Sequence, residues 1–200
     1  MPIKAVIFDA DGIITHGERF SKRFSKDYNI SMDKINPFFE NKFNMCLTGK
    51  EDLKEAIIPF LKNWGWNGSV EDLMDYWFHG ESEIESRMIV FIQELRASGI
   101  KCYLATNNEK HRTNFFLEHL GFDVLFDGIF SSAFIGSKKP ENEFYRHIFR
   151  SLGDLQKNEV LFWDDDQEKV DGALRFGFKA QLYKGFEDFE MRISKLIFSE

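Results

Sequence analysis

The chain has 200 residues, of which 43% are hydrophobic and 30% charged, a balance typical of a folded globular protein rather than a disordered or fibrous one. Its 33 acidic and 26 basic side chains give a formal net charge of −7, which disfavours a general nucleic-acid-binding surface. No apolar run reaches the roughly 18 residues of a membrane span, and two cysteines are too few for a disulfide scaffold. We expect a cytoplasmic protein without nucleic-acid or membrane partners, present as a monomer or weak homodimer.

The first predicted strand covers residues 3–8, an apolar run that only Lys4 interrupts. A nearly continuous run of Ile, Val and Phe is typical of a strand buried on both faces, as in a parallel sheet. The segment 9–12 ends the run abruptly. Asp9 and Asp11 are therefore expected at the carboxyl end of the first strand.

Residues 15–85 have the pattern of a small all-helical module. The segment Thr48-Gly49-Lys50-Glu51 matches a capping box, which predicts a helix from there to about residue 63. Residues 69–72 predict the start of another helix, and 18–28 and 32–43 also have helical patterns. No strand is predicted in this part of the chain.

After residue 81, predicted helices alternate with predicted strands. The strands are expected at residues 100–105, around 129–131, at 160–163 and at 179–183. Repeated strand–helix units imply right-handed crossovers and a parallel sheet covered by helices on both faces. The predicted fold class is therefore α/β, a three-layer Rossmann-like parallel sheet core with an inserted all-helical cap. We expect the core to comprise residues 1–14 and 86–200, and the cap residues 15–85.

Polar side chains lie directly after consecutive predicted strands or in the loops that follow those strands. They are Asp9 and Asp11, Thr106 and Asn107, Lys139, and Asp164 and Asp165. Each alone has an ordinary explanation, because such residues often form turns or cap helices. Ligands of open parallel sheets, however, bind at the carboxyl ends of the strands. The recurrence of polar residues at these positions therefore indicates one shared site.

The residue types at this site favour chemistry on a phosphate group. If the carboxylates of Asp9, Asp164 and Asp165 lie close together, their mutual repulsion raises the pKa values of these groups unless a cation binds between them. Oxygen ligands suit Mg²⁺, which binds through a few carboxylates together with substrate phosphate. Lys139 and the Thr106 hydroxyl would add a positive charge and a hydrogen-bond donor for an anion. Such a set favours phosphoryl transfer, in which electrostatics carries most of the catalysis.

Four segments, in order along the chain, resemble the four motifs of the haloacid dehalogenase-like (HAD) hydrolases. They are Ile7-Phe8-Asp9-Ala10-Asp11-Gly12, Leu104-Ala105-Thr106-Asn107, Lys139-Pro140 and Leu161-Phe162-Trp163-Asp164-Asp165. The helical module between the first two resembles the cap that this family inserts after its first motif. The fourth motif looks like the subgroup of sugar-phosphate, nucleotide and flavin-mononucleotide phosphatases. The resemblance implies a Mg²⁺-dependent phosphohydrolase that acts on a small phosphorylated metabolite.

The resemblance also implies a role for each matching residue. Asp9 would attack phosphorus and become an aspartyl phosphate, while Asp11 would protonate the leaving oxygen and then activate water. Mg²⁺ would be held by Asp9, Asp165 and the Asp11 backbone carbonyl, with Asp164 assisting directly or through water.

The remaining matching residues would bind the phosphate group. They are Ala10, Thr106, Asn107 and Lys139. Two of them, Thr106 and Lys139, would also be catalytic, with Lys139 offsetting charge on Asp9 and the phosphate. Lys138 is an alternative to Lys139 as the lysine of the third motif, but Lys139 stands next to Pro140 and fits the motif better. Asp166 replaces a small polar residue common in the family and is expected to face solvent or to cap the next helix.

Other functions use similar residues. A response-regulator receiver domain has its acidic pair after the first strand and its lysine on the last, the reverse of the order here. Carbon–halogen hydrolases of the superfamily generally lack the second aspartate of the first motif and the metal carboxylates, both present here. A sugar phosphomutase of the same superfamily, which shields the aspartyl phosphate from water, stays open as an alternative. So does a non-catalytic binding module on this fold.

The helical module should select the leaving group, because the core contacts only the phosphate. His16 and His79 could enter the cleft from it, although solvated or capping histidines are more common. Its aromatic residues either contact substrate or fill its own core, and the second use is the more frequent. They include Trp64, Trp66, Trp77, Phe38 and Phe39. Cys46 and Cys102 show no partner for catalysis.

Overall fold

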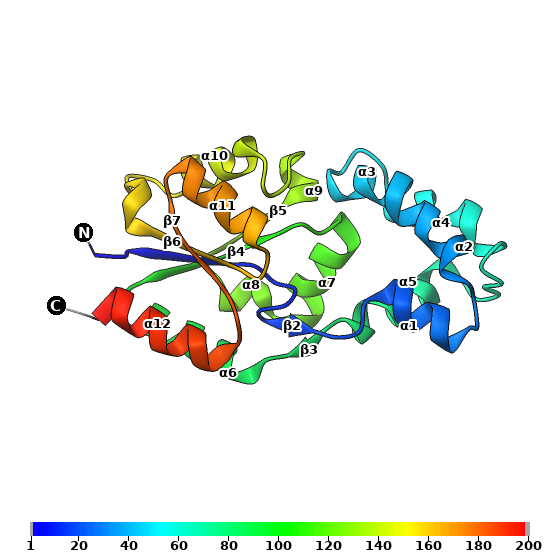
Figure 1. Cartoon of the computed structure of the whole chain (residues 1–200), viewed down its shortest axis with the longest axis horizontal. Coiled ribbons are helices and arrows are strands. Elements are labelled where there is room, and N and C mark those ends of the chain that lie inside the picture. Colours follow the sequence, from blue (N-terminus) through cyan, green and yellow to red (C-terminus); the bar gives the residue numbers. More distant parts are fainter. Residues whose placement is uncertain (1, 199–200) are drawn as a thin grey trace.

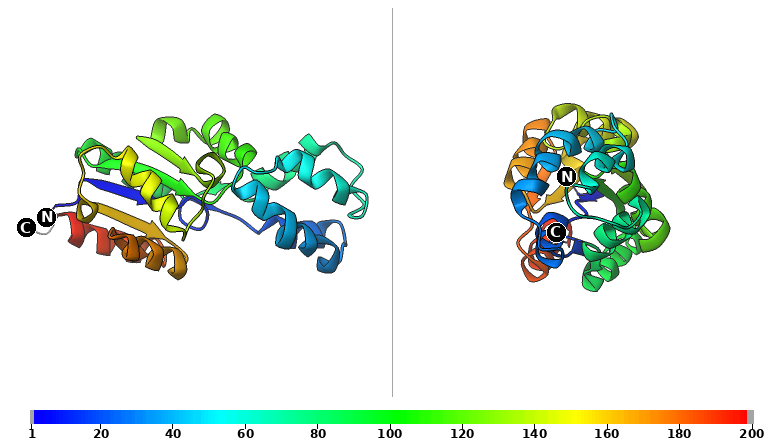
Figure 2. Two further views of the ribbon diagram at one scale, coloured as in Figure 1. Left: turned by 90° about the horizontal axis from the view of Figure 1, so that it is seen from above. Right: turned by 90° about the vertical axis from the view of Figure 1, so that its right-hand side faces the viewer.

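A computed structural model describes residues 2–198. Residues 1, 199 and 200, which belong to the predicted core, lie outside the described residues. The parallel sheet and its helices form one end of the molecule, where both termini lie (Figure 1). The helical insertion, defined here as residues 20–80 and comprising α1 to α5, forms the other end. The molecule is elongated (Figure 2), and the two parts are joined near β2 (Thr15–His16) and β3 (Glu83–Ile84), as Figure 1 shows.

Within residues 2–198 the main sheet has five parallel strands in the order β5-β4-β1-β6-β7. The strands are β1 (Ala5–Phe8), β4 (Lys101–Thr106), β5 (Gly128–Ser131), β6 (Val160–Asp164) and β7 (Lys179–Leu182). Phe8 at the end of β1 pairs with Leu104 and Trp163 on the two neighbouring strands. The residues that follow β1, β4 and β6 therefore emerge side by side. The predicted α/β fold and its parallel sheet are confirmed.

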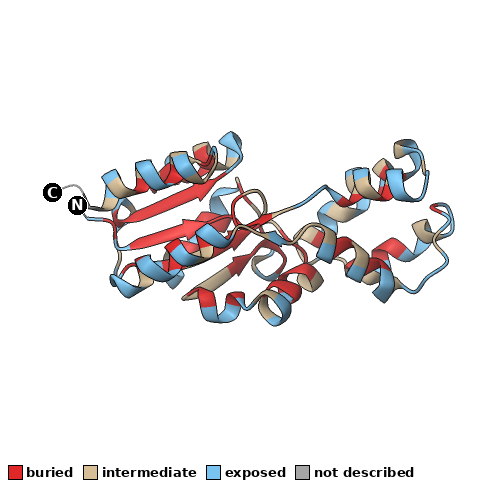
Figure 3. Ribbon diagram, turned by 90° about the horizontal axis from the view of Figure 1, so that it is seen from below, coloured by how far each residue is buried: buried red, intermediate tan, exposed pale blue. Residues whose placement is uncertain are grey.

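Helices cover both faces of this sheet, and its strands β1 and β6 are entirely buried (Figure 3). Val6 and Phe8 belong to the same apolar cluster as residues of α6 (Ser86–Ala97), α7 (Lys110–Leu120) and α12 (Phe186–Phe198). The alternate residues Ala5 and Ile7 belong to a second cluster with α10 (Asn142–Ser151) and α11 (Gln167–Phe176). Side chains alternate between the faces of a strand, so a continuous apolar run serves both layers at once.

Shorter helical segments connect these elements. They are α8 (Phe122–Leu125), α9 (Ser132–Ile135) and the 3₁₀ turn η2 (Lys157–Glu159). Among residues 2–198, no helix combines the length and the apolar character that crossing a membrane would require.

The helical insertion has a core made largely of aromatic rings. Its elements are α1 (Phe20–Asp27), α2 (Met32–Pro37), the π-helical segment η1 (Phe38–Lys42), α3 (Phe43–Leu47), α4 (Leu53–Leu61) and α5 (Val70–Gly80). Phe20 stacks on Trp77 with ring centroids 4.3 Å apart. Trp64 is buried, and its indole Nε1 donates a hydrogen bond to the Lys34 carbonyl at 2.8 Å. Trp64 is thus a core residue of the insertion.

The helix predicted to begin at Thr48 begins later. Thr48 instead follows the last residue of α3, and its hydroxyl donates to the Asn44 carbonyl at 3.4 Å. Gly49 adopts a φ of +67°, which reverses the chain after α3. Asp52 then caps α4 by accepting from the Lys54 amide at 2.9 Å. The capping box at Ser69 is formed as a true helix start.

Two short strands also depart from the prediction. Thr15–His16 (β2) and Glu83–Ile84 (β3) pair as an antiparallel ribbon where the chain leaves the sheet for the insertion and returns. Both strands lie within residues 15–85, where no strand is predicted. Two-residue strands are too short to show an alternating pattern. The predicted boundaries at residues 14/15 and 85/86 fall beside this ribbon and stay a prediction.

Candidate active site

A cavity of about 570 Å³ lies where the carboxyl ends of the strands face the insertion. The first loop lines it with Asp9 and Asp11, and the loop after β6 and the start of α11 contribute Asp165 and Lys169. The loop after β4 and the following helix contribute Asn107, Asn108, Glu109 and Arg112. The insertion contributes an aromatic wall that includes Phe39, Phe43 and Trp77. The cavity therefore has one charged and one largely apolar wall.

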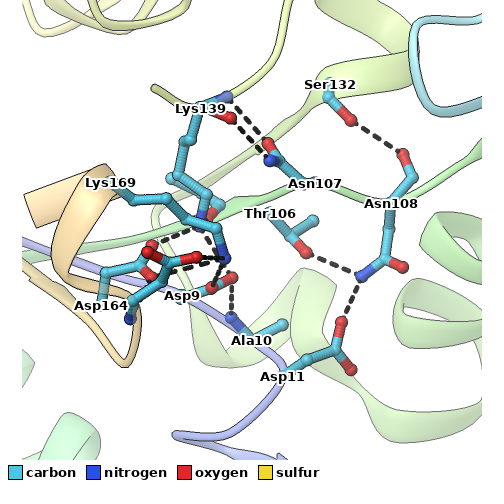
Figure 4. Close-up of polar contacts among 12 residues, drawn as sticks. Asp9, Ala10, Asp11, Thr106, Asn107, Asn108, Ser132, Lys139, Asp164 and Lys169 are labelled. Carbon is cyan, nitrogen blue, oxygen red and sulfur yellow. Dashed lines mark hydrogen bonds and ion pairs between the residues drawn. The ribbon is translucent and has the colours of Figure 1, made fainter. Parts of the chain in front are cut away.

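Asp9 lies between two lysines. Its carboxylate is 4% exposed; Oδ1 lies 2.9 Å from Lys139 Nζ, and Oδ2 lies 3.5 Å from Lys169 Nζ. Oδ1 also accepts a hydrogen bond of 2.7 Å from the Ala10 amide. Asp9 and its partners Lys139 and Lys169 come from the carboxyl end of β1, the loop before α10 and the first turn of α11 (Figure 4).

Lys139 is held rigidly, with a side chain that is 0% exposed. Its ammonium group contacts Asp164 Oδ2 at 2.7 Å and donates to the Ala105 carbonyl at 2.7 Å. The Asn107 side chain donates to the Lys139 carbonyl and accepts from the Lys139 amide, both at 2.9 Å. Asn107 thus positions the backbone that carries the lysine. Lys138 points elsewhere and donates to Asn44 Oδ1 in the insertion at 2.8 Å.

Three carboxylates come close enough to hold one metal ion. Asp9, Asp164 and Asp165 each offer an oxygen, and these oxygens lie within 4.8 Å of one another. A Cβ atom on Gly12, whose φ is +85°, would lie only 2.2 Å from Asp165 Oδ2, so glycine permits the close approach of the two loops. Oxygen-only donors fit a hard divalent cation such as Mg²⁺.

The crowding of carboxylates changes their acidity. Burial raises the pKa of Asp9 to about 6, and the Asp164 charge adds to this rise while Lys139 and Lys169 oppose it. Burial and the Asp9 charge likewise raise the pKa of Asp165. Burial acts to lower the pKa of Lys169, but the Asp9 and Asp164 charges outweigh it and raise that pKa, so Lys169 is charged. The cluster therefore favours an added positive charge.

Asp11 has separate partners. Its Oδ1 accepts from Arg112 Nη2 at 2.7 Å and from the Thr15 hydroxyl at 3.1 Å, and its Oδ2 accepts from Asn108 Nδ2 at 2.7 Å. Burial acts to raise the pKa of Asp11, but the Arg112 charge and these hydrogen bonds outweigh it and lower the pKa below its ordinary value. Asp11 is thus stabilised as a carboxylate.

Arg112 connects this carboxylate to the insertion. Its side chain is 3% exposed, and Nη2 also donates to the Glu81 carbonyl at 2.9 Å, just after α5. Nη1 lies 3.7 Å from Glu81 Oε2. A buried arginine requires such partners, and here they belong to the first loop and to the end of α5.

Comparison with known protein families agrees with these features. A family model for haloacid dehalogenase-like hydrolases matches residues 3–177. The chain belongs to this family. The matched residues include the strands β1, β4, β5 and β6, the helical insertion and the loops that carry Asp9, Lys139 and Asp165.

Several curated relatives are named as phosphatases or nucleotidases. A sesquiterpene phosphatase from Aspergillus oryzae is 37% identical over 94 residues, which are 46% of this chain and 47% of that protein. A GMP/IMP nucleotidase from Escherichia coli is 32% identical over 91 residues, 46% of this chain and 40% of the relative. These two matches span half or less of the relatives' length. A phosphatase from Mycobacterium tuberculosis is 25% identical over 197 residues, 91% of this chain and 88% of its own.

Solved HAD structures share the fold over nearly the whole chain. A predicted HAD-like hydrolase from Porphyromonas gingivalis superposes with a TM-score of 0.83 at 21% identity, covering 100% of both chains. A HAD family enzyme from Bacteroides thetaiotaomicron, solved with magnesium and inorganic phosphate, has a TM-score of 0.80 at 19% identity and covers 95% of this chain and 98% of its own. At these identities the likeness establishes the fold.

Of the residues that the HAD motifs nominate, some line the cavity and others lie behind its wall. Asp9, Asp11, Asn107 and Asp165 are lining residues. The others, Ala10, Thr106, Lys139 and Asp164, are buried. Thr106 Oγ1 accepts from Asn108 Nδ2 at 2.7 Å. The Ala10 amide, nominated as a phosphate ligand, donates here to Asp9 itself. Their functional roles stay predictions.

Several other residues expected near the site have different surroundings. Asp166 caps α11 by accepting from the Glu168 amide, as expected. His16 lines the cavity, whereas His79 is exposed and packs edge-on against Phe115.

Among the aromatic residues of the insertion, Phe39 and Trp77 line the cavity. Trp64, Trp66 and Phe38 do not, and Trp64 and Phe38 are buried in the insertion. Cys46 and Cys102 are buried, free thiols.

Three residues that sequence reasoning left without a role belong to this site: Asn108, Arg112 and Lys169. Arg112 and Lys169 lie on the helices that follow β4 and β6, in their first turns. A helix that begins at the carboxyl end of a parallel strand presents its first turn to that edge of the sheet. This position was the available signal for both side chains.

Proposed function

We propose that this chain is a Mg²⁺-dependent phosphohydrolase of small phosphomonoesters that works through an aspartyl-phosphate intermediate. The observation that carries the proposal is the meeting of Asp9, Asp164 and Asp165 with Lys139 at one edge of the sheet. The names of the relatives, two phosphatases and a nucleotidase, support the same class of reaction.

In the first step Asp9 attacks phosphorus, so that an Asp9 oxygen–phosphorus bond forms as the ester P–O bond breaks. Lys139, fixed by Asp164 and Asn107, offsets negative charge on Asp9 and on the phosphate. Thr106 and the amides of Ala10 and Asn107 are proposed to hold phosphoryl oxygens. The Ala10 amide would exchange its present bond with Asp9 for one with the phosphate.

Asp11 is proposed to give a proton to the leaving oxygen and then to take one from the water that attacks the aspartyl phosphate. That water breaks the bond between Asp9 and phosphorus and releases inorganic phosphate. The present surroundings favour the charged, base form of Asp11. The acid step therefore requires that Asp11 gain a proton when substrate enters, as its contact with Arg112 loosens.

Asp9, Asp164, Asp165 and the backbone carbonyl of Asp11 would hold Mg²⁺. When bound, the ion supplies positive charge against the phosphoryl oxygens. Its liganding carboxylates come from β1 and β6, neighbouring strands of the sheet.

The cavity is much larger than a phosphate group requires and is bounded by the helical insertion. We infer that the leaving group contacts Phe39, Phe43 and Trp77, while His16 and Arg19 provide polar contacts on the same side. Flat leaving groups, such as a nucleoside or a flavin, and sugars fit this combination of surfaces. The insertion thus has the proposed role of a cap that selects the substrate.

A panel of phosphomonoesters tests the proposal, with Mg²⁺ present and inorganic phosphate as the readout. The panel should include hexose phosphates, nucleoside monophosphates and flavin mononucleotide, with Asp9→Asn as the inactive control. Release of phosphate by the wild-type protein but not by the Asp9→Asn variant supports hydrolysis. Conversion of a hexose 1-phosphate to its isomer without phosphate release would instead support a phosphomutase. An inert panel would favour a non-catalytic binding module.

A further inference from the structure

A second lysine, Lys169, faces the carboxylate cluster, and its contacts differ from those of Lys139. Its Nζ lies 3.5 Å from Asp9 Oδ2, 3.5 Å from Asp164 Oδ1 and 4.0 Å from Asp166 Oδ2. Lys139 makes three contacts of 2.9 Å or less. Lys169 therefore lies among several carboxylates without a close bond to any one of those three oxygens.

Lys169 is also the more exposed of the two lysines. Its side chain is 20% exposed and lines the cavity, whereas that of Lys139 is 0% exposed and lies behind the wall. Four flexible bonds connect its ammonium group to the third residue of α11. The group can thus move within the cavity while the helix stays in place.

The charges around Asp9 explain what such a lysine would do. The carboxylates of Asp9, Asp164 and Asp165 outnumber the ammonium groups of Lys139 and Lys169 by one, when Asp166, which is 48% exposed and screened by solvent, is not counted. A divalent cation turns this into an excess of one positive charge, which attracts a phosphate anion. Without Lys169, the same set with a divalent cation would be neutral. One lysine thus opposes cation binding and favours anion binding.

We propose that Lys169 is a charge-balancing residue that weakens the binding of the divalent cation and strengthens the binding of the phosphate group. Its ammonium group neutralises Asp9 and Asp164 before the cation enters, and the cation must displace it. Once displaced, it stays within reach of the cavity and contacts phosphoryl oxygens. This inference rests on the proposed function, because it assumes that the cluster binds Mg²⁺.

Two binding measurements on the full-length chain test the proposal. Isothermal titration calorimetry with MgCl₂ alone measures cation affinity, and titration of inorganic phosphate at saturating Mg²⁺ measures anion affinity. For Lys169→Met we expect Mg²⁺ to bind roughly tenfold more tightly and phosphate roughly tenfold more weakly. Opposite signs are the signature, since a merely structural role would weaken both.

Three further variants serve as controls. Lys169→Arg keeps the charge and should stay within about threefold of the wild type for both ligands, because the cluster's net charge is unchanged. Lys184→Met removes an exposed lysine after β7 and should change neither affinity. Lys169→Gln replaces the Met variant if circular dichroism shows that the latter does not fold.

The outcomes separate this inference from the proposed function. If the wild type binds Mg²⁺ but the neutral Lys169 variant binds it equally or more weakly, the charge-balancing role is wrong and the phosphohydrolase proposal survives. Unchanged phosphate affinity would also overturn the role. If the wild type binds no Mg²⁺, both proposals fail together.

Discussion

Asp9 and Asp11 are separated by one residue, yet they occupy two electrostatically different ends of the cavity. Asp9 is 4% exposed, and burial together with the Asp164 charge raises its pKa to about 6, although the two nearby lysines oppose the rise. Asp11 is 47% exposed, and the charge of Arg112, which also lies near Glu81, together with the hydrogen bonds to Asp11, outweighs burial and lowers the pKa of Asp11. Two carboxyl groups that are close in the chain thus differ in acidity, because burial and the neighbouring charges set the pKa of each.

The difference suits the two proposed roles. The Asp9 end concentrates negative charge and is stabilised when a cation and a phosphate arrive together. The Asp11 end is already balanced, and its arginine also contacts the carbonyl of Glu81 at the end of the insertion. Protonation of Asp11 is therefore tied to contacts that the insertion makes. Substitutions at each end should have effects of different size and kind.

Removal of the nucleophile should have the largest effect. Asp9→Asn should lower kcat by at least about a thousandfold, because the amide cannot form the acyl phosphate. Steady-state phosphate release with an excess of Mg²⁺ measures the loss, and circular dichroism checks that the fold is intact. Substantial Mg²⁺-dependent turnover by this variant would reject Asp9 as the nucleophile.

Asp11→Asn should have the next largest effect, lowering turnover by roughly 10²–10⁴-fold. The loss in formation of the intermediate should depend on the leaving group. An alkyl phosphate, which needs a proton on departure, should suffer more than p-nitrophenyl phosphate, which does not. Rapid-quench measurement of the first turnover distinguishes the two substrates. Equal losses for both would argue against Asp11 as the general acid.

Arg112 tests the link between the two ends. Arg112→Met should raise the pKa of Asp11 and shift the alkaline limb of the kcat/KM profile to higher pH, because the cation that stabilises the carboxylate is gone. Turnover at neutral pH should change by roughly tenfold. Arg112→Lys keeps the charge and should retain most of the wild-type profile. A profile that is merely scaled, without a shift, would make Arg112 a structural residue only.

Stability provides the smallest but most direct test of the crowding at Asp9. The folded pKa of about 6 lies above the ordinary 3.8, so the folded state loses stability as pH rises through this window. Asp9→Asn removes this loss and should raise the free energy of unfolding by about 1–3 kcal/mol at pH 7.5 in metal-free buffer. Urea denaturation at pH 7.5 and pH 4 measures it. The gain should shrink at pH 4, and a destabilised variant at pH 7.5 would contradict the crowding.

Much of the fold follows from rules that apply to whole segments. The continuous apolar run before Asp9 predicts a strand buried on both faces, and parallel strands place their ends at one edge. The meeting of Asp9 with Asp164 follows from that rule, whereas Lys139, in the loop after β5 and α9, is predicted from its loop and from the resemblance to the HAD motif.

What could not be predicted depends on individual side chains. Arginine is mostly exposed in proteins, so no pattern indicates that Arg112 is buried against Asp11. The ribbon of β2 and β3 is too short for periodicity. At Thr48 two local signals competed, and the reversal at Gly49 with the better cap at Asp52 prevailed. Among the aromatic residues of the insertion, only packing separates Trp64 in the core from Trp77 at the cavity.

Direct trapping of the acyl phosphate tests the proposed chemistry most sharply. The protein is mixed with substrate and Mg²⁺, quenched within one turnover and treated with borohydride, which reduces an acyl phosphate to the alcohol. Peptide mass spectrometry should then find homoserine at position 9 and an unmodified Asp11, with the yield increased in Asp11→Asn. Turnover that proceeds while Asp9 stays unreduced, or reduction at another carboxylate, would contradict nucleophilic attack by Asp9.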